Sequence, residues 1–226
     1  MNLRSPSEAG EREGSAAGRV VWVSVLWALV HSLLASRRAK DLARRLAGAR
    51  YRDGLYRAAY NAQALASVVW IARWFVRLPD RELYRVRPPW SWLLRVGQVV
   101  SLGVLLSGVR VVGIPEFSGL TSLWRFLTGE DVGPEPEAQG PPMGAGGEVV
   151  GSGAFRFTRH PGNLGALGFF LLLPRMTANR AVLTALVALY VVLGSMHEEQ
   201  RLRAAYGAAY ERYRRTAPFL IPRPSR

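Results

Sequence analysis

Five apolar blocks separated by arginine-rich connectors form the main pattern of hydrophobic and polar positions along the chain. The blocks lie at residues 20–35, 58–76, 92–113, 163–174 and 181–196. A helix needs about 20 residues to cross the hydrocarbon core of a bilayer, within a range of about 17–25. The first three blocks reach this length once flanking residues are counted. The pattern predicts an all-α integral membrane bundle with about five transmembrane helices.

The fourth and fifth blocks are shorter, and the dipeptide Pro174-Arg175 separates them. Because proline and a charged residue interrupt the apolar run there, we expect a tight turn between two helices. The two helices would then form a membrane hairpin. The alternative is a pair of buried helices in a soluble domain.

Two segments have a composition that cannot bury a core of its own. Residues 1–18 are polar and rich in Gly, Ser and Glu, without the features of a signal peptide, so we expect a disordered tail. Residues 129–152 are rich in Gly, Pro and Glu, which predicts a flexible loop. These segments divide the chain into a tail (1–18), a three-span region (19–128), the loop (129–152) and a C-terminal region (153–226).

The charge balance narrows the choice of partners. The 226 residues carry 30 Lys+Arg against 16 Asp+Glu, a formal net charge of +14. Such a charge suggests nucleic acid or an anionic membrane surface. No helix-turn-helix or aromatic sheet motif is visible, so we expect no nucleic-acid partner. The absence of cysteine excludes disulfides, thiolate metal sites and thiol catalysis, and three scattered histidines predict no metal site.

The arginines also predict the orientation of the helices. Short cytoplasmic loops carry an excess of Lys and Arg, and the basic residues concentrate at positions 37–57 and 201–226. This distribution predicts a multi-pass protein of the cell (inner) membrane, with its N-terminus outside and its C-terminus in the cytoplasm.

In this topology the polar residues of the apolar blocks collect at the cytoplasmic boundary. His31, Tyr60 and Asn61 lie near the inner ends of the first two blocks, His160 precedes the fourth, and residues 197–199 follow the fifth. Polar groups at membrane depth are costly and usually face a bundle interior or a watery cavity. We therefore expect a site that opens to the cytoplasm, with His31, Tyr60 and Asn61 toward the acceptor. The alternative is that each residue only caps a helix or reaches the interface.

The sharpest local motif is GAFRFTRHPGNLG, from Gly153 to Gly165. Pro161 fits the first turn of a helix, so Arg159 and His160 stand at a helix N-terminus, which attracts anions. The motif predicts a site for a carboxylate or phosphate. A juxtamembrane belt of arginine and aromatic residues is the alternative.

A second motif, MHEEQRLRAAYGAAYERYRRTAPFLIPRP, follows the last block. The acidic pair Glu198 and Glu199 is suited to ribose hydroxyls or an amino group, although pairing of Glu199 with Arg203 at i+4 is an alternative. The remaining pattern predicts an amphipathic basic-aromatic helix on the inner leaflet. Its apolar face consists of Leu202, Tyr206, Tyr210 and Tyr213.

Together the two motifs resemble the signatures of the isoprenylcysteine carboxyl methyltransferase superfamily of membrane methyltransferases. The first resembles G-P-[YF]-R-[YF]-x-R-H-P-x-Y-x-G, and the second resembles the E-E-x-x-L tail with its tyrosines and two prolines. HSLLASRRAK and LYRAAYN are similar to the N-terminal half of bacterial members of the methanethiol S-methyltransferase and NnrU types.

The resemblance implies S-adenosylmethionine as methyl donor, bound at the cytoplasmic membrane face. It assigns cofactor binding to the matching positions: Arg159, His160, Pro161, Asn163, Gly165, Glu198, Glu199, Leu202, Tyr206 and Tyr210. Asn163 departs from the signature, which has tyrosine there. Thr216 replaces the basic residue typical of the isoprenylcysteine enzymes, which argues against a prenylcysteine carboxylate as substrate.

We therefore expect a methyltransferase that acts on a small thiol or an apolar, membrane-partitioned acceptor. Methyl transfer from a sulfonium depends on orientation and exclusion of water and requires no metal. The catalytic candidates are His31, Asn61 and His160, and either histidine is suited to act as general base. The alternatives are a non-enzymatic NnrU-like protein, an isoprenylcysteine-type carboxyl O-methyltransferase, and a basic scaffold on the membrane surface. The sequence gives no information on the oligomeric state.

Overall fold

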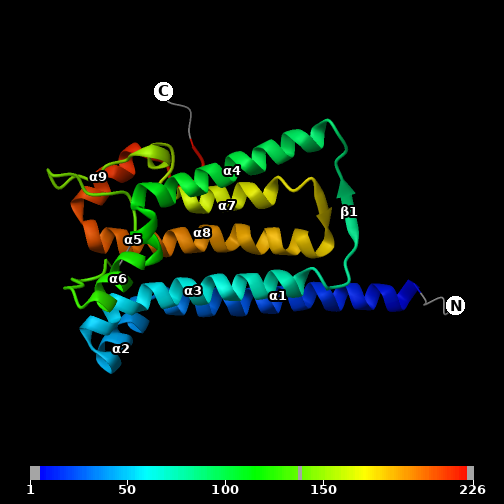
Figure 1. Ribbon diagram of the computed structural model, residues 1–226. Coiled ribbons are helices and arrows are strands. Elements are labelled where there is room, and N and C mark those ends of the chain that lie inside the picture. Colours follow the sequence, from blue (N-terminus) through cyan, green and yellow to red (C-terminus); the bar gives the residue numbers. More distant parts are fainter. Residues whose placement is uncertain (1–5, 137–138, 223–226) are drawn as a thin grey trace.

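The computed structural model describes residues 6–136 and 139–222, with side chains from residue 14 onward (Figure 1). Helices make up most of this part of the chain. The elements are α1 (Pro6–Ala35), α2 (Arg37–Ala47), α3 (Ala49–Phe75), β1 (Glu82–Arg85), α4 (Trp90–Val112), α5 (Ile114–Ser118), α6 (Leu120–Thr128), the 3₁₀ turn η1 (Gly153–Arg156), α7 (Pro161–Leu171), β2 (Arg175–Thr177), α8 (Ala178–Tyr206) and α9 (Ala208–Thr216).

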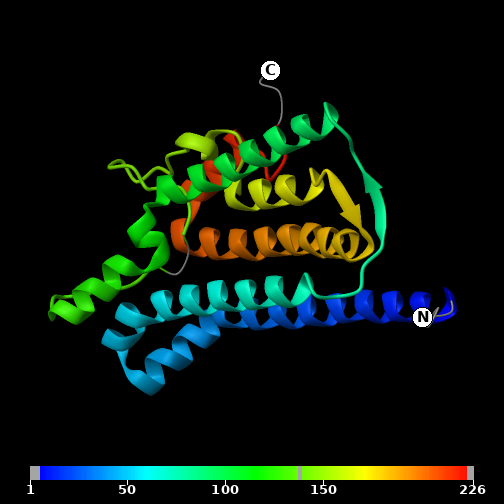
Figure 2. The same ribbon diagram turned by 45° about the vertical axis from the view of Figure 1, so that its right-hand side comes forward.

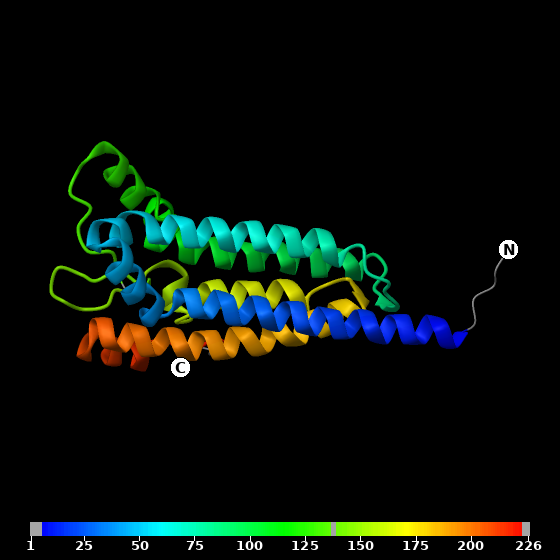
Figure 3. The ribbon, with the colours of Figure 1, turned by 90° about the horizontal axis from the view of Figure 1, so that it is seen from below.

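The long helices run side by side as a bundle, which Figure 3 shows from below. α1 packs against α3 and α8, and α7 lies between α4 and α8. The short elements α2, α5, α6 and α9 gather at one end of the bundle, and β1 and β2 close the other end (Figure 1). The segments that carry the two sequence motifs therefore lie at the end opposite the sheet.

Within the described residues, three helices are long and apolar enough to cross a membrane, at Gly14–Ala35, Trp90–Val112 and Ala178–Tyr206. Their large apolar side chains are widely exposed, as Trp22, Leu29 and Val99 illustrate. A soluble domain rarely leaves apolar patches of this extent exposed. The exposed surface fits a lipid bilayer and disfavours a soluble helix pair.

The five spans expected from the sequence are not all supported by helix length. α7 has 11 residues, so it extends about 17 Å, which is too short to cross the core of a bilayer alone. α3 has 27 residues and is long enough, but Asn61, Gln63 and Arg73 interrupt its apolar run, and it is not among the helices apolar enough to cross a membrane. Length and composition thus support three spans in the part of the chain that the structure describes.

The small sheet was missed by the sequence analysis. β1 and β2 pair antiparallel, with Glu82 opposite Thr177 and Arg85 opposite Arg175. Strands of four and three residues are too short to show an alternating pattern. The tight turn expected at Pro174-Arg175 is therefore a strand that pairs with the connection between α3 and α4.

The Glu82 carboxylate ties the two strands together. It accepts hydrogen bonds from Arg85 Nη2 at 2.7 Å and from Arg175 Nε at 2.6 Å. The hydrogen bond from Arg85 is the largest of the causes that lower the pKa of Glu82. A carboxyl group whose pKa is lowered by folding adds stability above its unfolded pKa and loses that contribution as the pH falls through its folded pKa.

We therefore expect Glu82→Gln to be less stable than wild type at neutral pH, and the difference to vanish as the pH falls through the lowered pKa of Glu82. Melting temperatures of both proteins in detergent across this range measure the difference. A difference that stays constant down to the acid limit would show that the charge of Glu82 does not contribute.

The first helix begins earlier than the sequence analysis expected. α1 starts at Pro6, whereas residues 1–18 were expected to be disordered. Ala, Glu and Arg are good helix formers, and extending an existing helix requires no new nucleus. The first five residues of the expected tail lie outside the described residues.

The C-terminal motif is not one continuous amphipathic helix. Gly207 has φ 53° and ψ −132° and separates α8 from α9, a conformation that favours glycine. α9 folds back on η1, so Tyr210 and Tyr213 lie in a buried cluster with Phe155 and Leu202. The aromatic residues expected to face the inner leaflet therefore pack against the protein.

A close helix contact holds α7 against α4. A Cβ atom on Gly165 would lie 2.4 Å from the Ser101 carbonyl oxygen and 2.7 Å from Leu105 N. Pro161 approaches α4 similarly at Gly108, where an added Cβ would lie 2.8 Å from Pro161 Cγ. Helix packing thus explains the residue type of Gly165 without a cofactor contact.

The described residues of 129–152 carry little regular structure but contact the helices at Glu135. Arg57 and Ser122 both contact the Glu135 carboxylate, and Arg52 Nη1 donates to the Glu135 carbonyl oxygen at 3.0 Å. These contacts fasten the start of the segment to α3 and α6. Its flexibility and the four-region division of the chain stay predictions.

Candidate functional site

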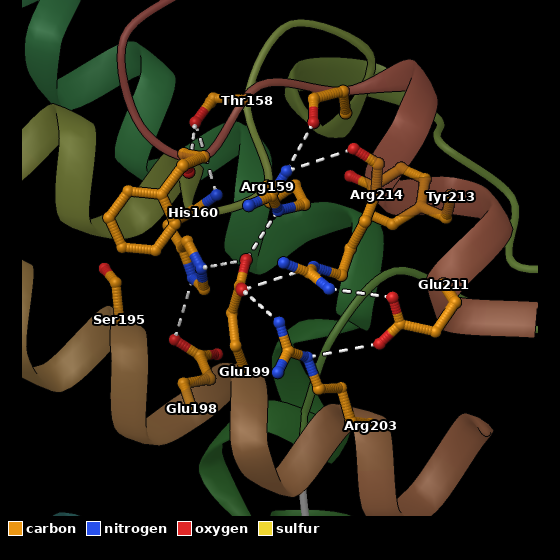
Figure 4. A network of polar contacts seen from close by, with 12 residues as sticks. Thr158, Arg159, His160, Ser195, Glu198, Glu199, Arg203, Glu211, Tyr213 and Arg214 are labelled. Carbon is orange, nitrogen blue, oxygen red and sulfur yellow. Dashed lines mark hydrogen bonds and ion pairs between the residues drawn. The ribbon is translucent and has the colours of Figure 1, made fainter. Parts of the chain in front are cut away.

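The two sequence motifs meet at a buried ion pair (Figure 4). Arg159 Nε donates to Glu199 Oε1 at 2.5 Å, across 40 positions of sequence. Arg159 Nη1 also donates to the carbonyl oxygens of Ala217 at 2.7 Å and Arg214 at 3.2 Å. The guanidinium joins the loop before α7 to α8 and to the end of α9. Glu199 and the chain's own carbonyl groups therefore occupy the Arg159 side chain, which the sequence suggested for an external anion.

The Glu199 carboxylate lies among three arginines. Glu199 Oε2 is 3.4 Å from Arg214 Nε and 3.8 Å from Arg203 Nη2. Both arginines also pair with Glu211 on α9 (Figure 4). The expected i+4 pairing with Arg203 is thus the longest of these contacts. Glu199 acts mainly as the centre of a network that fixes α9 on α8.

His160 connects the two glutamates. Its Nδ1 is 3.2 Å from Glu198 Oε2, and its Nε2 is 3.5 Å from Glu199 Oε1. The His160 side chain is 1% exposed. Nε2 is buried and has no hydrogen-bond partner among the described residues. A buried polar atom without a hydrogen-bond partner is unusual, and the nearby acidic atom here is Glu199 Oε1.

The C-terminal segment covers the motif loop from one side. Arg159 N donates to the Pro218 carbonyl oxygen at 3.0 Å. The Phe219 ring lies edge-on to His160 at 5.2 Å and 5.6 Å from the Arg159 guanidinium carbon. The proline-rich end of the chain therefore shields the network from solvent.

Glu198 faces a cavity of about 300 Å³ between α1, α3, α5 and α8. Unlike Glu199, its side chain is 30% exposed. The lining of the cavity includes His31, Tyr56, Tyr60, Asn61, Glu198 and Arg201. The structure thus brings together polar residues of both halves of the chain that the sequence placed at one depth.

Tyr60 and His31 form a pair at this cavity. Their Oη and Nε2 atoms are 2.7 Å apart, and the His31 ring stacks on Trp27 at 4.7 Å between centroids. The Asn61 amide instead donates to the carbonyl oxygens of Phe117 at 2.9 Å and Ser118 at 3.0 Å. His31 and Tyr60 therefore line the cavity as a hydrogen-bonded pair, whereas Asn61 mainly holds α5.

The other expected cofactor residues have structural contacts. Asn163 Nδ2 donates to Ser195 Oγ at 2.8 Å, which joins α7 to α8. Leu202 and Tyr210 are core residues, and Tyr206 packs against their cluster. Burial raises the pKa of Tyr210 and of Tyr213 well above its ordinary value, so both hydroxyls stay protonated at neutral pH. Neither tyrosine is suited to act as a base.

Tyr213 Oη donates to the Phe155 carbonyl oxygen at 2.7 Å. Removing this buried bond in Tyr213→Phe should lower the free energy of unfolding by about 1 kcal/mol. Tyr206→Phe is the matched control, because no hydrogen bond of the Tyr206 hydroxyl exists within the described part of the chain. Thermal unfolding in detergent measures both, and equal melting temperatures for the two variants would contradict the assignment.

Three contributors to the site were missed by the sequence analysis. Arg201 follows Glu198 by three positions and so shares its helix face, a spacing that could have identified it. Glu135 and Arg214 lie far from their partners in sequence, and no local pattern indicates either contact. Groups of His, Asp or Glu suited to hold a metal ion are absent from residues 6–136 and 139–222.

Comparison with known proteins shows that part of the chain is similar to methyltransferases. The chain is 38% identical over 69 residues to Methanethiol S-methyltransferase 2 of Bradyrhizobium diazoefficiens, which covers 30% of this chain and 27% of the relative. Methanethiol S-methyltransferases of Crocosphaera subtropica and Mycobacterium tuberculosis are 35% and 36% identical over 68 and 72 residues. These segments cover 30% and 32% of this chain and 27% and 30% of those relatives.

The matches support a relationship to a methyltransferase family. The matched part of the chain spans less than a third of each relative. No family model matches the chain, and no solved structure matches it. The homologues and the apolar helices together fit a membrane methyltransferase.

Proposed function

We propose that this chain is an integral membrane methyltransferase that uses S-adenosylmethionine and methylates a small thiol or apolar, membrane-partitioned acceptor. The observation that carries the proposal is the cavity where Glu198 of the second motif meets His31 and Tyr60 of the N-terminal half. The methanethiol S-methyltransferase relatives supply the reaction class and the thiol as the first acceptor to test.

The residues at this cavity fit the proposed methyl donor chemically. S-adenosylmethionine presents an ammonium group and ribose hydroxyls, which a carboxylate such as Glu198 binds, and a carboxylate, which the Arg201 guanidinium binds. His160 lies outside the lining of this cavity, and its Nδ1 is 3.2 Å from Glu198 Oε2. Glu198 and Arg201 would therefore hold the donor, and His160 would orient the Glu198 carboxylate.

The chain's own residues would bind the methyl donor, orient it toward the acceptor and deprotonate the acceptor. The donor, when bound, supplies an electrophilic methyl group, and no covalent enzyme intermediate is needed. His31 is suited to take the proton of an acceptor thiol, because an imidazole nitrogen accepts protons and the Tyr60 hydroxyl, 2.7 Å from its Nε2, orients the ring at the cavity. Glu199 and Arg159 would act indirectly, because they hold His160 and α9 in place.

We further infer that the protein lies in the cell (inner) membrane with its N-terminus outside and its C-terminus in the cytoplasm. This orientation places the arginine-rich α2 and α9 on the inner side, as the positive-inside rule favours. The charged donor would then reach Glu198 from the cytoplasm, while the acceptor would enter from the hydrocarbon core of the bilayer.

A non-enzymatic NnrU-like protein is the second candidate, and one observation favours it. The position of the signature tyrosine is Asn163, whose amide binds Ser195 at 2.8 Å and so offers the donor no aromatic ring. An isoprenylcysteine-type carboxyl O-methyltransferase has less support, because Thr216 lacks the positive charge typical of that branch.

Product formation separates these candidates. Purified protein in detergent is incubated with S-adenosylmethionine carrying a deuterated methyl group and with a panel of small thiols. We expect a deuterated thioether and S-adenosylhomocysteine in equal amounts, and a slower rate for His31→Gln and Tyr60→Phe than for the control Asn61→Gln. S-adenosylhomocysteine without any methylated product, or no turnover with thiols and apolar acceptors, would contradict the proposal.

A further inference from the structure

A second hollow of about 480 Å³ lies where the end of α1, the start of α2 and α8 meet. We call it the basic groove. Leu33, Ser36, Arg37, Arg38, His197 and Arg201 line it. Figure 2 shows α2 turning away from the bundle at the end of α1. The groove is distinct from the cavity that contains His31 and Tyr60.

The charged side chains that line the basic groove are all positively charged. It contains three guanidinium groups, and no aspartate or glutamate belongs to its lining. Arg37 and Arg38 are exposed and form no hydrogen bond or ion pair within the described parts of the chain. Arg201 donates from Nη1 to the Ala35 carbonyl oxygen at 3.2 Å, but its Nε is buried without a partner there. Such a cluster is suited to a group with several anionic oxygens.

The position of the basic groove relative to the apolar helices indicates what that anion is attached to. The candidate span of α1 ends at Ala35, one residue before Ser36, and the apolar block of α8 ends at Met196, one residue before His197. Lipid headgroups lie where apolar spans end. The basic groove therefore lies at headgroup depth on two packed helices.

An exposed apolar strip leads to the groove along α1. Leu26, Leu29 and Leu33 follow the i, i+3, i+7 spacing of one helix face and are 62%, 64% and 64% exposed. Leu33 itself lines the groove. The same surface thus offers an apolar path for acyl chains and, at its end, a cluster of cations.

We propose that the basic groove binds the phosphate headgroup of an anionic phospholipid, whose acyl chains lie along the leucine strip of α1. A free phosphate would satisfy the arginines and leave the leucines uncovered, so the combination favours the lipid. The proposal is independent of methyl transfer. Arg201 lines both hollows, so a bound lipid would also fix one wall of the cavity beside Glu198.

Native mass spectrometry and thermal unfolding test this site. The full chain is purified in detergent and titrated with phosphatidylglycerol or phosphatidylcholine. The variant Arg37→Gln/Arg38→Gln is compared with Arg45→Gln/Arg212→Gln, which removes the same charge from exposed positions outside the groove. Each arginine near an anionic headgroup contributes about a fivefold gain, so the double variant should bind phosphatidylglycerol about 30-fold more weakly.

The expected result is retention of phosphatidylglycerol over phosphatidylcholine by wild type and by the control, and its loss in the groove variant. Equal retention of the two lipids by wild type would overturn the proposal, and so would an equal loss in both double variants. In a last experiment, inorganic phosphate is added to the wild-type protein at the same concentration as the lipid. If it raises the melting temperature as much as phosphatidylglycerol does, the site is one for free phosphate and the lipid assignment is wrong.

Discussion

Replacing Glu199 with alanine is expected to destabilise the folded chain by about 3–5 kcal/mol. The substitution leaves the Arg159 guanidinium buried without its carboxylate, and it also removes the contacts to Arg214 and Arg203. An uncompensated buried charge is among the costliest single changes in a protein. Thermal or denaturant unfolding of the detergent-solubilised protein measures the loss.

Glu198→Ala is the matched control, because it removes the neighbouring carboxylate of the same helix. Glu198 is partly exposed, and its one ion-pair contact within the described chain is to His160 at 3.2 Å, so its removal should cost under about 1 kcal/mol of stability. Similar stabilities for Glu198→Ala and Glu199→Ala would contradict the division of roles between the two glutamates.

Replacing Gly165 with alanine is expected to lower the free energy of unfolding by about 1–3 kcal/mol. The added Cβ would lie 2.4 Å from the Ser101 carbonyl oxygen and 2.8 Å from Leu105 Cβ, so α7 must move away from α4. That movement would also shift Arg159 and His160, which directly precede α7. Alanine favours helix by about 1 kcal/mol over glycine, so a net loss reports the clash.

Gly162 provides the control on the same helix, because an added Cβ there meets nothing within 4 Å. We expect Gly162→Ala to be neutral or stabilising by up to about 1 kcal/mol. The melting temperatures of the two variants measure the contrast. If Gly165→Ala is as stable as Gly162→Ala, the close approach of α4 and α7 is not what positions the motif loop.

Some elements of the fold could be predicted from the sequence and others could not. The apolar runs of α1, α4 and α8 identified helices able to span a membrane, because spans depend on length and composition alone. The position of α7 was harder to predict, because an apolar block of 12 residues does not show whether it crosses the bilayer or packs beside longer helices. The strands β1 and β2 are too short to carry a period.

The candidate site was foreseen as a cluster of residues but not as a set of contacts. Polar residues at equivalent depth do come together, as His31, Tyr60 and Glu198 show at one cavity. Partners could not be predicted, because Arg159 and Glu199 are 40 positions apart and the local alternative, Arg203, was equally plausible by spacing. The tyrosines of the C-terminal motif turned inward because of the break at Gly207.

This geometry separates the acidic pair into two functions. Glu199 is buried in an ion-pair network and should act on stability, whereas Glu198 faces the cavity and should act on ligand binding. The sequence alone gave both residues the same role. A change at Glu198 therefore tests the proposed chemistry without the loss of folding that a change at Glu199 would cause.

The most direct test of the central claim is calorimetric titration of the purified protein with S-adenosylmethionine, for wild type and Glu198→Gln. A hydrogen bond to a charged group is worth about 1.5–3 kcal/mol, so we expect the wild type to bind and Glu198→Gln to bind about tenfold to 100-fold more weakly, at an unchanged melting temperature. No heat of binding for the wild type at millimolar ligand, or equal affinity in both proteins, would contradict the proposed donor site.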